Sequence, residues 1–378
     1  MKILILSCNT GQGHNSAGNA VKEALEALGV VCDMVDALSF TRRRYTSRLV
    51  SGTYVKMVSV APIVFGGIYK AGDIISSPRF KSPVYFANAL SAARLGFFID
   101  AGGYDGVVMP HVFPAETLTR LKRRKRTHVR TYAVATDYTC SPFWEETDPD
   151  YFFIPHQDLA DEFASKGIPM KKLVPTGIPV SSKYEVKIPK SDAREQLGLP
   201  KDAKTFLIMT GSMGFGDISG LVFRLLHRMD GEFVRLLVMT GRSEKLRRHI
   251  EEDFGNDERV IAVPFTLQVP LYMDACDVLL TKPGGLTTTE AAVKHVPFVH
   301  TKPIPGCETK NARFFSSHGM SVYVKNFRDT ADAAAGLASD PEACRLMIEK
   351  QQSEMPRLAA DTIARFIISD IKAHVGDV

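Results

Sequence analysis

The chain has 378 residues, of which 45% are hydrophobic and 24% are charged, and its formal net charge is +5. This length suits two domains, and this composition excludes a disordered or low-complexity protein. The six cysteines lie far apart and none has the spacing of a zinc site, which excludes a disulfide scaffold and indicates reduced thiols in a cytosolic protein.

The first residues predict neither a secretion signal nor a membrane span. An apolar strand at 2–7 starts almost at once, with no basic segment, long apolar segment or cleavage site before it. The most apolar window, 57–69, is interrupted by a proline and two glycines and is shorter than the roughly 20 residues that a spanning helix needs. We therefore expect a cytoplasmic protein.

Basic residues cluster at 41–48 and at 120–130. Such clusters suit a polyanionic surface, either phospholipid or nucleic acid, although each cluster alone is equally consistent with a solvated helix face. The segment 40–80 combines its basic residues with apolar and aromatic ones, which suits a lipid surface. A buried helical hairpin within the first domain is the alternative for this segment.

Strand-like and helix-like patterns alternate along the whole chain. The apolar runs that predict strands in the first half are 2–7, 105–110, 129–136 and 151–156. The corresponding runs of the second half are 205–211, 234–241, 260–265, 278–284 and 298–303. Because helical patterns separate these apolar runs, the strands are expected to be parallel and buried on both faces.

A proline-rich segment at 174–191 separates the two halves and has the character of an exposed connector. We therefore predict an α/β protein with two Rossmann-like, doubly wound domains that face each other across a cleft, at 1–180 and 181–356. A final helix is expected within 357–378, and its sequence is compatible with packing on either domain.

Glycine-bearing loops follow several predicted strands, where ligands of parallel α/β sheets bind. These loops are 8–18, 211–217, 240–244 and the start of 281–299. The first loop, which contains His14, matches neither a strict GxGxxG nor a P-loop, and Asp36 is a weak partner for a ribose. A nicotinamide site is therefore poorly supported.

The segment TKPGGLTTTEAAVKHVPFV, 281–299, is the most informative. Gly284 and Gly285 allow a ligand to approach the backbone closely, and the threonines after them lie beside the free N–H groups of a new helix, which favours an anion. Glu290, one turn further, would repel a phosphate but suits a ribose. A nucleoside diphosphate meets both demands, and a plain N-cap with a capping box is the alternative.

Segments along nearly the whole chain together resemble one enzyme family. They are SCNTGQGHNSAGNAV (7–21), ATDY (135–138), VPTGIPV (174–180), GSMGFG (211–216) and the donor segment 281–315. In this order they resemble the glycolipid-forming glycosyltransferases, namely the monogalactosyldiacylglycerol synthases and the bacterial processive diacylglycerol glucosyltransferases. The resemblance implies the GT-B fold and inverting transfer of a hexose from a UDP-sugar to diacylglycerol. It also implies peripheral association with an anionic membrane surface, no catalytic metal or other cofactor, and no nucleic-acid partner.

The resemblance also implies roles for individual residues. The residues implied to bind the nucleotide-sugar are Gly13, Gly211, Ser212, Gly214, Phe265, Thr266, Gly284, Gly285, Thr287, Thr288, Glu290, Glu308 and Asn311. Among them the 284–288 residues are assigned to the diphosphate, Glu290 to the ribose, 265–266 to the uracil, and Glu308 with Asn311 to the sugar. The residues assigned to the acceptor or the membrane are Arg42, Arg43, Arg44, Phe65, Tyr69 and Trp144.

The expected reaction needs a base beside the acceptor hydroxyl. The resemblance places His14 at the reaction centre, and an imidazole has an unperturbed pKa of about 6.5, which suits this role. Asp137 is the second catalytic candidate. The alternatives are that His14 only contacts a phosphate or the backbone, and that Asp137 is a strand-end turn residue.

Two departures from the family pattern concern the substrates. Cys307 stands where relatives usually have glutamine, so the donor hexose stays open, and the segment 139–142 lacks a histidine found in many relatives. Other functions compatible with the sequence are a UDP-sugar 2-epimerase, a transferase acting on a soluble or peptidoglycan-precursor acceptor, and a non-enzymatic nucleotide-sugar sensor.

Overall fold

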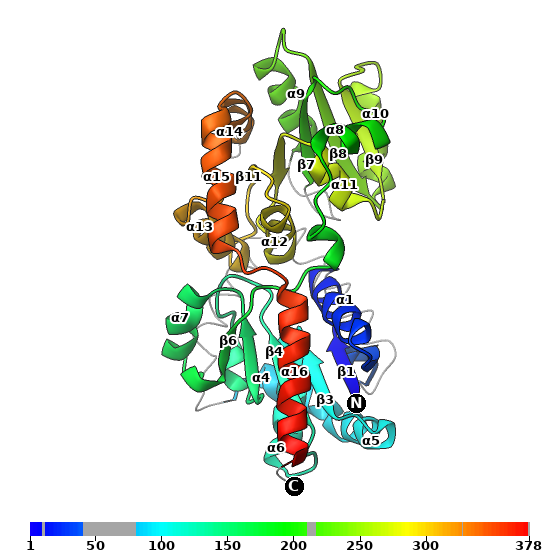
Figure 1. The fold of residues 1–378 in the computed structure, drawn as a ribbon, viewed down its shortest axis with the longest axis vertical. Helices are drawn as coiled ribbons and strands as arrows, with labels where there is room; N and C mark the ends of the chain where they lie inside the picture. The colour runs from blue at the N-terminus through cyan, green and yellow to red at the C-terminus, as the bar shows by residue number, and fades with distance from the viewer. Residues whose placement is uncertain (10–11, 41–80, 210–216, 327, 377–378) are drawn as a thin grey trace. The chain divides into compact units, whose positions relative to one another are not determined.

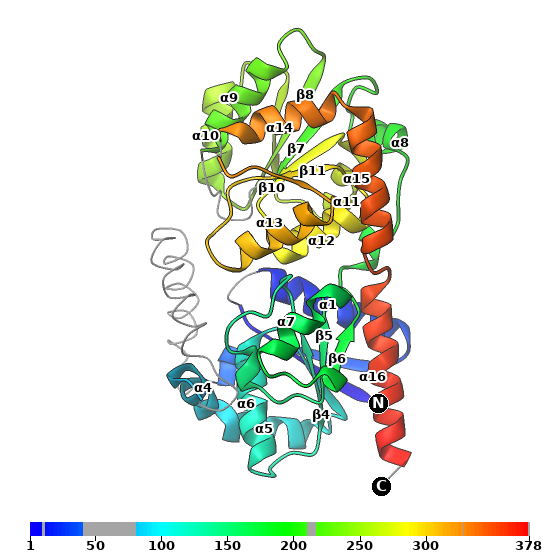
Figure 2. The ribbon, with the colours of Figure 1, turned by 90° about the vertical axis from the view of Figure 1, so that its left-hand side faces the viewer.

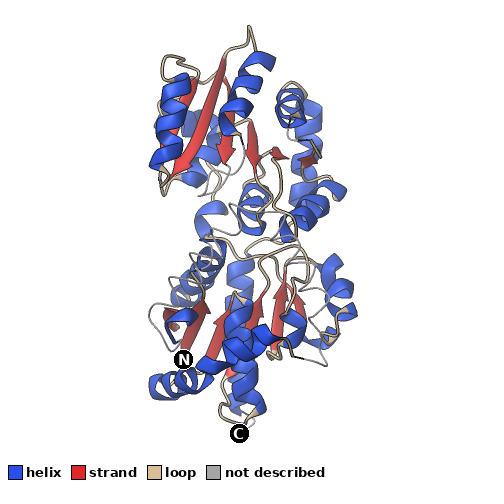
Figure 3. Ribbon diagram, turned by 180° about the vertical axis from the view of Figure 1, so that it is seen from behind, coloured by secondary structure: helices blue, strands red, loops and turns tan. Residues whose placement is uncertain are grey.

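The structure, a computed structural model, describes residues 1–9, 12–40, 81–209, 217–326 and 328–376. The chain divides into two compact units, built mainly from Met1–Ser182 with Pro356–Val378 and from Lys183–Ile304 with Glu308–Met355. Each unit contains a six-stranded sheet whose paired strands are all parallel, with helices around it (Figures 1 and 3). The prediction of two doubly wound α/β domains is confirmed.

The sheet of the first unit has the strand order β2-β1-β3-β4-β5-β6. Its strands are β1 (Lys2–Ser7), β2 (Val31–Asp36), β3 (Gly106–Met109), β4 (Arg130–Val134), β5 (Tyr151–Ile154) and β6 (Leu173–Pro175). Its α-helices are α1 (Gln12–Ala27), α4 (Pro83–Asn88), α5 (Ala92–Gly102), α6 (Val112–Arg123), α7 (Ala160–Ser165) and α16 (Ala359–Gly376). Its 3-10 segments are η1 (Ala37–Phe40), η2 (Ala89–Ser91), η3 (Trp144–Glu146), η4 (Gln157–Leu159) and η5 (Met170–Lys172).

The sheet of the second unit has the order β12-β11-β10-β7-β8-β9. Its strands are β7 (Lys204–Met209), β8 (Val234–Gly241), β9 (Val260–Pro264), β10 (Val278–Thr281), β11 (Phe298–His300) and β12 (Val322–Tyr323). Its helical segments are η6 (Ser182–Tyr184), α8 (Lys190–Gln196), α9 (Ile218–Arg228), α10 (Glu244–Phe254), α11 (Val269–Ala275), α12 (Gly285–Val293), α13 (Cys307–Ser317), α14 (Asp329–Ala338) and α15 (Pro341–Glu354).

The last helix, α16, packs beside α1 in the first unit (Figure 1). Ile363, Ile367 and Ile371 recur every four residues and are buried in the core of this unit, because this spacing puts them on one helical face. A Cβ atom at Gly106 would lie 2.9 Å from the Ile371 Cδ1 atom, so the helix approaches β3 closely. The end of the chain thus completes the core of its first domain.

The structure adds three strands outside the predicted apolar runs, namely β2, β6 and β12. β6 lies within the segment that was read as a connector, and β12 is only two residues long. β6 stands at the edge of its sheet, where Pro175 is tolerated because no further strand needs its missing N–H donor. Within the described ranges, every helix is too short or too polar to cross a bilayer.

Candidate active site

The predicted site residues lie at the carboxyl edges of the two sheets. In each sheet the chain reverses its direction of strand addition at one point, between β1 and β3 and between β7 and β10. Such switch points leave a crevice beyond the strand ends, where ligands bind. His14 follows β1, and the segment from Gly284 to Glu290 follows β10, so each unit brings its own set of candidates to its own switch point.

His14 lies in the first turn of α1 and is partly buried. Its Nδ1 atom is 2.9 Å from the carbonyl oxygen of Pro110 and 3.0 Å from Oγ1 of Thr136. Because a carbonyl only accepts, Nδ1 carries the hydrogen and donates it to Pro110, which leaves a lone pair on Nε2. Burial holds the His14 pKa below its ordinary value, against the opposing effect of the Pro110 hydrogen bond. The imidazole is therefore neutral near pH 7, as a general base must be.

A second histidine, which the sequence reasoning missed, stands beside His14. His111 caps the N-terminus of α6 by accepting the Phe113 backbone N–H on Nδ1 at 3.1 Å. Its ring meets that of His14 edge to face with centroids 4.5 Å apart. Burial, and then the charge of His14, hold the pKa of His111 well below its ordinary value. The sequence signal available for it was a histidine directly after the predicted strand run 105–110.

The other first-unit candidates surround the same strand ends. Asp137 is partly buried and follows Thr136 directly, so it lies one residue from a hydrogen-bond partner of His14. Gly13 precedes His14 in the first turn of α1. Asp36, the weak ribose candidate, instead accepts a 2.8 Å hydrogen bond from Nδ2 of Asn9 and helps to shape the first loop. His14 and Asp137 are thus brought to one edge of the sheet.

In the second unit, α12 begins with its backbone donors uncapped by a side chain. Gly284 is the N-cap residue and no side-chain cap hydrogen bond is present, so the plain-cap alternative does not describe this helix. Thr287 is partly exposed and Gly285 is buried, and the fully buried Thr288 hydroxyl has no partner among the described residues. Free N–H groups at the positive end of a helix favour a bound anion.

Glu290 lies one turn inside α12 and is 9% exposed. Burial raises the pKa of this carboxyl to about 8, and the nearby Tyr184 hydroxyl opposes that rise. Tyr184 ends η6, the segment that follows the proline-rich stretch, and no local pattern marked it as a site residue. With a pKa of about 8, this carboxyl is largely protonated near pH 7 and becomes a carboxylate acceptor as the pH rises.

Glu308 and Asn311, assigned to the donor sugar, brace the loop before α12. Glu308 accepts the Ile304 backbone N–H at 2.8 Å and forms an ion pair with Lys282. Asn311 is fully buried and its amide donates to the Pro283 carbonyl oxygen at 3.0 Å. Glu308 is partly exposed, so its carboxylate can contact a ligand. Asn311 instead stabilises the loop through its hydrogen bond to Pro283.

The residues assigned to the uracil follow β9. Phe265 is 53% exposed, and the guanidinium of Arg242 stands 4.5 Å from its ring centroid. The Thr266 hydroxyl accepts the Gln268 backbone N–H at 3.0 Å, which shapes this turn. Arg242, which follows β8 in the loop TGR, was not singled out from the sequence. Gly211, Ser212 and Gly214 lie outside the described residues.

Of the residues assigned to the acceptor or the membrane, the structure describes Trp144. Arg42, Arg43, Arg44, Phe65 and Tyr69 lie outside the described residues. Trp144 is 5% exposed and its ring packs edge to face on Phe152 with centroids 6.0 Å apart, so the indole belongs to the core, where it cannot reach a lipid surface directly.

The basic run 120–130 is only partly available to an anionic surface. Lys122 pairs with Asp150 at 2.9 Å, and Arg130 forms two hydrogen bonds with Asp370, at 2.8 and 2.7 Å. The four residues 123–126, at the end of α6 and just after it, are exposed. These four supply the surface charge of the run.

An apolar surface that the sequence reasoning missed lies on the helices that pack against α6, which are grouped in Figure 2. Phe86 on α4 is 54% exposed, Leu90 on η2 is 87% exposed and Phe97 on α5 is 77% exposed. These residues lie on three consecutive helical segments. Tyr85, Ala89 and Leu95 of the same segments are buried. The sequence signal for the surface was therefore a set of apolar residues in addition to those that the core needs.

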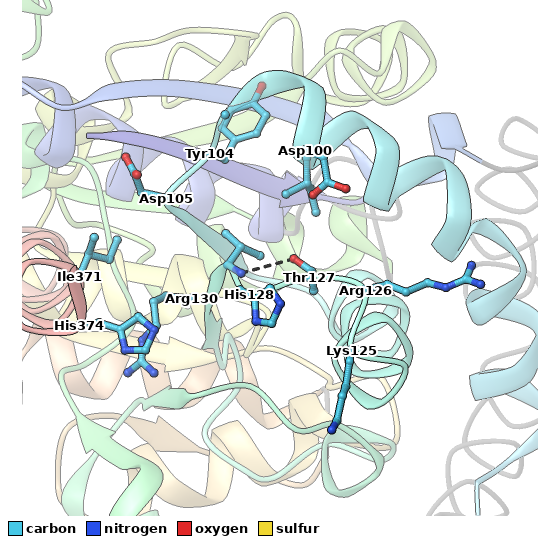
Figure 4. Close-up of a pocket in the computed structure, with 13 residues that line it drawn as sticks. Asp100, Tyr104, Asp105, Lys125, Arg126, Thr127, His128, Arg130, Ile371 and His374 are labelled. Atoms are coloured by element: carbon cyan, nitrogen blue, oxygen red, sulfur yellow. Dashed lines mark hydrogen bonds between the residues drawn. The ribbon is translucent and has the colours of Figure 1, made fainter. Parts of the chain in front are cut away.

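A cavity of about 740 Å³ opens at the opposite, amino edge of the first sheet (Figure 4). Its lining includes Tyr104, Lys125, His128, His374 and Arg130, the first residue of β4. None of the predicted catalytic residues lines it. The candidate active site is therefore assigned to the carboxyl edges and not to this cavity.

Comparisons with known proteins agree with this arrangement. The family model of monogalactosyldiacylglycerol (MGDG) synthase matches residues 14–180, and the model of the glycosyltransferase family 28 C-terminal domain matches residues 205–367. A processive diacylglycerol beta-glucosyltransferase of Bacillus pumilus is 25% identical over 369 residues, which cover 97% of this chain and 94% of the relative.

Solved structures share the fold. MurG of Acinetobacter baumannii aligns with a TM-score of 0.62 at 13% identity, covering 97% of this chain and 99% of that one. A UDP-GlcNAc 2-epimerase of Neisseria meningitidis, bound to UDP-GlcNAc, aligns with a TM-score of 0.61 at 13% identity, covering 98% of this chain and 100% of that one. At these identities the likeness concerns the fold alone. With both halves matched by transferase family models, the chain is a glycosyltransferase with the GT-B fold, and it is similar over nearly its whole length to the processive diacylglycerol glucosyltransferases.

Proposed function

We propose that this protein transfers a hexose from a UDP-sugar to a diacylglycerol-type acceptor at a membrane surface, with inversion at the anomeric carbon. The observation that carries the proposal is the neutral His14, whose Nδ1 is engaged by Pro110 and whose Nε2 has a free lone pair, in the unit matched by the MGDG synthase model. The name of the Bacillus pumilus relative, a diacylglycerol beta-glucosyltransferase, supports the choice of acceptor and of hexosyl donor.

In the proposed reaction, Nε2 of His14 accepts the proton of the acceptor hydroxyl as its oxygen bonds to the anomeric carbon. The bond between that carbon and the diphosphate oxygen breaks, and UDP leaves with the electron pair. The uncapped N–H groups of α12 and the ammonium of Lys282 offset the charge that develops on the diphosphate. Because burial lowers the pKa of His14, the imidazolium readily returns its proton to water.

Asp137 is proposed to assist this step, either by sharing the proton or by holding the acceptor. It follows Thr136, whose hydroxyl is 3.0 Å from Nδ1 of His14. Glu290 is proposed to accept the ribose hydroxyls, and the loop after β9 to border the uracil. No metal or organic cofactor has a part in this proposal.

Membrane association is proposed for the helical layer that α4, η2, α5 and α6 form. The exposed side chains of Phe86, Leu90 and Phe97 supply apolar contact. The exposed basic residues 123–126 supply charge, and each basic residue near an anionic surface contributes about 1 kcal/mol. Insertion of an apolar face beside a basic one is the pattern of peripheral membrane proteins.

Two other activities on the same fold remain as alternatives. A UDP-sugar 2-epimerase would use the same donor site, as the solved epimerase with a shared fold illustrates. A transferase for a peptidoglycan-precursor or other soluble acceptor would also use the same donor site. The exposed apolar face favours the lipid acceptor over both.

The test is product analysis. The purified protein is incubated with UDP-glucose, UDP-galactose or UDP-N-acetylglucosamine, each with and without diacylglycerol vesicles. A glycosylated diacylglycerol that forms only with vesicles supports the proposal, and its sugar identifies the donor. Formation of an epimerised UDP-sugar without acceptor would replace the proposal with the epimerase, and transfer to a soluble acceptor alone would reject the diacylglycerol assignment.

The donor site has its own test. Glu290→Ala is expected to weaken UDP binding in calorimetry by up to about 3 kcal/mol, the upper range for a hydrogen bond to a charged group. Circular dichroism checks that the variant is folded. An unchanged UDP affinity would remove Glu290 from the donor site.

A further inference from the structure

The short helix α4 packs beside α6 (Figure 2) and is joined at its C-terminal end to a buried glutamate of that helix. The amide of Asn88, the last residue of α4, donates a hydrogen bond to Oε2 of Glu116. The Thr117 hydroxyl, next along α6, donates to the carbonyl oxygen of Asn88 at 3.1 Å. Glu116 is fully buried, and its Oε1 atom has no hydrogen-bond partner among the described residues.

A second buried glutamate holds the other end of α4. Oε2 of Glu146, in η3, accepts hydrogen bonds from the Ser82 backbone N–H at 2.9 Å and from the Ser82 hydroxyl at 3.0 Å. Ser82 is the N-cap residue of α4, and its hydroxyl also accepts the Tyr85 backbone N–H at 3.2 Å. Because isolated helices need roughly 12 residues or more to be stable and α4 has six, this helix depends on such tertiary contacts.

The contact at the C-terminal end of α4 tolerates a negative charge poorly. Burial raises the pKa of Glu116 to about 8, and the charge of Glu146 acts in the same direction. The hydrogen bond from Asn88 and the charge of Lys81 oppose this rise without cancelling it. Ionisation of Glu116 therefore places a charge on a buried carboxyl that has a single hydrogen-bond donor, which is unfavourable unless water reaches it.

Charged and titratable groups lie on every side of Glu116. They are Arg120 and Arg123 on α6, Lys81 and Tyr85 before and within α4, Arg94 and Asp100 on α5, Glu145 and Glu146 on η3, and Arg130 and Tyr132 on β4. The two charged residues of α5 are exposed, and the two residues of β4 are engaged with Asp370. The groups that act on the Glu116 charge are Glu146 and Lys81, in opposite directions. Access of water through displacement of α4 is therefore the main way to relieve an ionised Glu116.

The segment that covers this carboxyl also carries exposed apolar residues. Phe86 and Leu90 lie on α4 and η2, and Asn88 lies between them. We propose that Glu116 and Asn88 form a proton-controlled latch, which holds α4 and η2 on α6 while Glu116 is protonated and releases them when it ionises. This inference rests on the proposed membrane association of this helical layer. An anionic surface at about −30 mV lowers the local pH by roughly half a unit, so it favours the latched layer.

The direction of the pH dependence follows from the Glu116 pKa, which is about 8 in the latched form and returns toward its ordinary value of 4.5 when α4 is displaced. The latched form therefore holds the proton through this range, and its advantage over the displaced form is lost as the pH rises from 4.5 to about 8. The equilibrium constant for displacement is expected to rise roughly 10- to 100-fold between about pH 5.5 and 7.5.

Amide hydrogen exchange of the full chain, read in peptides that cover residues 83–91, measures this displacement. Glu116→Gln keeps an acceptor for the Asn88 amide and cannot ionise. Between about pH 5.5 and 7.5, after correction for intrinsic exchange, protection of this segment is expected to fall roughly 10- to 100-fold in the unaltered protein and to stay constant in Glu116→Gln. Asp100→Asn, at an exposed residue of α5, is the matched control and should behave as the unaltered protein. Asn88→Ala should lower the protection throughout the pH series.

Co-sedimentation with anionic vesicles at high salt tests what the latch controls, because salt screens the basic residues and leaves the apolar contribution. The unaltered protein and Asp100→Asn are expected to bind more strongly at about pH 6 than at about pH 8, and Glu116→Gln is expected to bind equally at both.

Each outcome decides the matter. The inference is wrong if Glu116→Gln and the unaltered protein show the same pH-dependent exchange, or if the loss of protection extends through β1 and α1, which would indicate a change in global stability. It is also wrong if vesicle binding by these two proteins depends on pH in the same way. If neither protein binds vesicles at any pH, the proposed membrane association fails and takes this inference with it, whatever the exchange shows.

Discussion

The ion pair between Lys294 and Asp274 offers a sharp test of what holds the donor helix in place. Lys294→Met keeps an apolar stem of similar length and removes the charge. It leaves the Asp274 carboxylate, 1% exposed, with the Ile188 N–H at 3.3 Å and without its cation. It also removes the donor of the Val186 carbonyl oxygen. Oδ1 of Asp274 already has no hydrogen-bond partner among the described residues, and Lys187 is then the cation that still interacts with the Asp274 charge.

The magnitude follows from these contacts. Removing one partner of a buried ion pair lowers the free energy of unfolding by about 3–5 kcal/mol. For a domain of about 150–250 residues, 1 kcal/mol shifts the melting temperature by about 2–4 °C, so the transition of the second unit should fall by roughly 6–20 °C. Differential scanning calorimetry of the full chain measures this shift directly.

Two controls make the result interpretable. Lys294→Met combined with Asp274→Leu removes both charges, and it is expected to recover much of the lost stability because no ion is left buried. Lys201→Met removes a cation whose partner, Glu195, is likewise exposed, and it is expected to leave the transition in place. A Lys294→Met protein that melts within about 2 °C of the unaltered one would refute the reasoning, because the pair would then contribute no more than a surface ion pair.

Three further predictions concern the site. Because burial raises the Glu290 pKa to about 8 and the ionised form accepts ribose hydroxyls, UDP affinity should rise between about pH 6.5 and 9 and should lose this dependence in Glu290→Gln; an affinity that falls with pH in calorimetry would contradict it. His14→Ala should lower kcat by roughly 10²–10⁴-fold with UDP affinity nearly kept. Because burial lowers the His14 pKa, the acid limb of the kcat profile of the unaltered enzyme should lie below about pH 6.5. Loss of UDP binding with normal turnover at saturation would instead make His14 a phosphate contact. Co-sedimentation with anionic vesicles should be retained in part at high salt. Leu90→Asp should abolish that retained part, while the control Val31→Asp, at an exposed residue of β2, should not. A protein that stays in the supernatant at low salt would reject the membrane proposal.

Local patterns in the sequence were enough to predict the fold class. The apolar run that predicts a strand at 234–241 coincides with β8, and the other long runs overlap their strands within a few residues. Such runs are readable because a strand buried on both faces needs consecutive apolar side chains, whatever it pairs with. The glycine loops could be placed for a similar reason, since in a parallel sheet every loop after a strand ends at the same edge.

Two edge strands, β6 and β12, were missed because their patterns are too short. β12 has two residues, and β6 ends in a proline that made the segment read as a connector. Neither carries a periodic signal, because an edge strand of two or three residues is stabilised by its neighbour more than by its own side chains. The same applies to Trp144, where an aromatic residue in a loop gives no sign of whether it is buried.

What the sequence determined by itself is therefore the alternation of strands and helices, the glycine loops, and the identities of His14 and Glu290 as candidates. Only the tertiary structure decided the state of those candidates. His14 owes its tautomer to Pro110 and a further contact to Thr136, which lie 96 and 122 residues away in the chain. Glu290 owes its raised pKa to burial in the folded unit, and α16 owes its place to the core around β3, with Arg130 and Asp370 joined across 240 residues. Contacts of this kind depend on which buried surfaces fit together, and no local period encodes that fit.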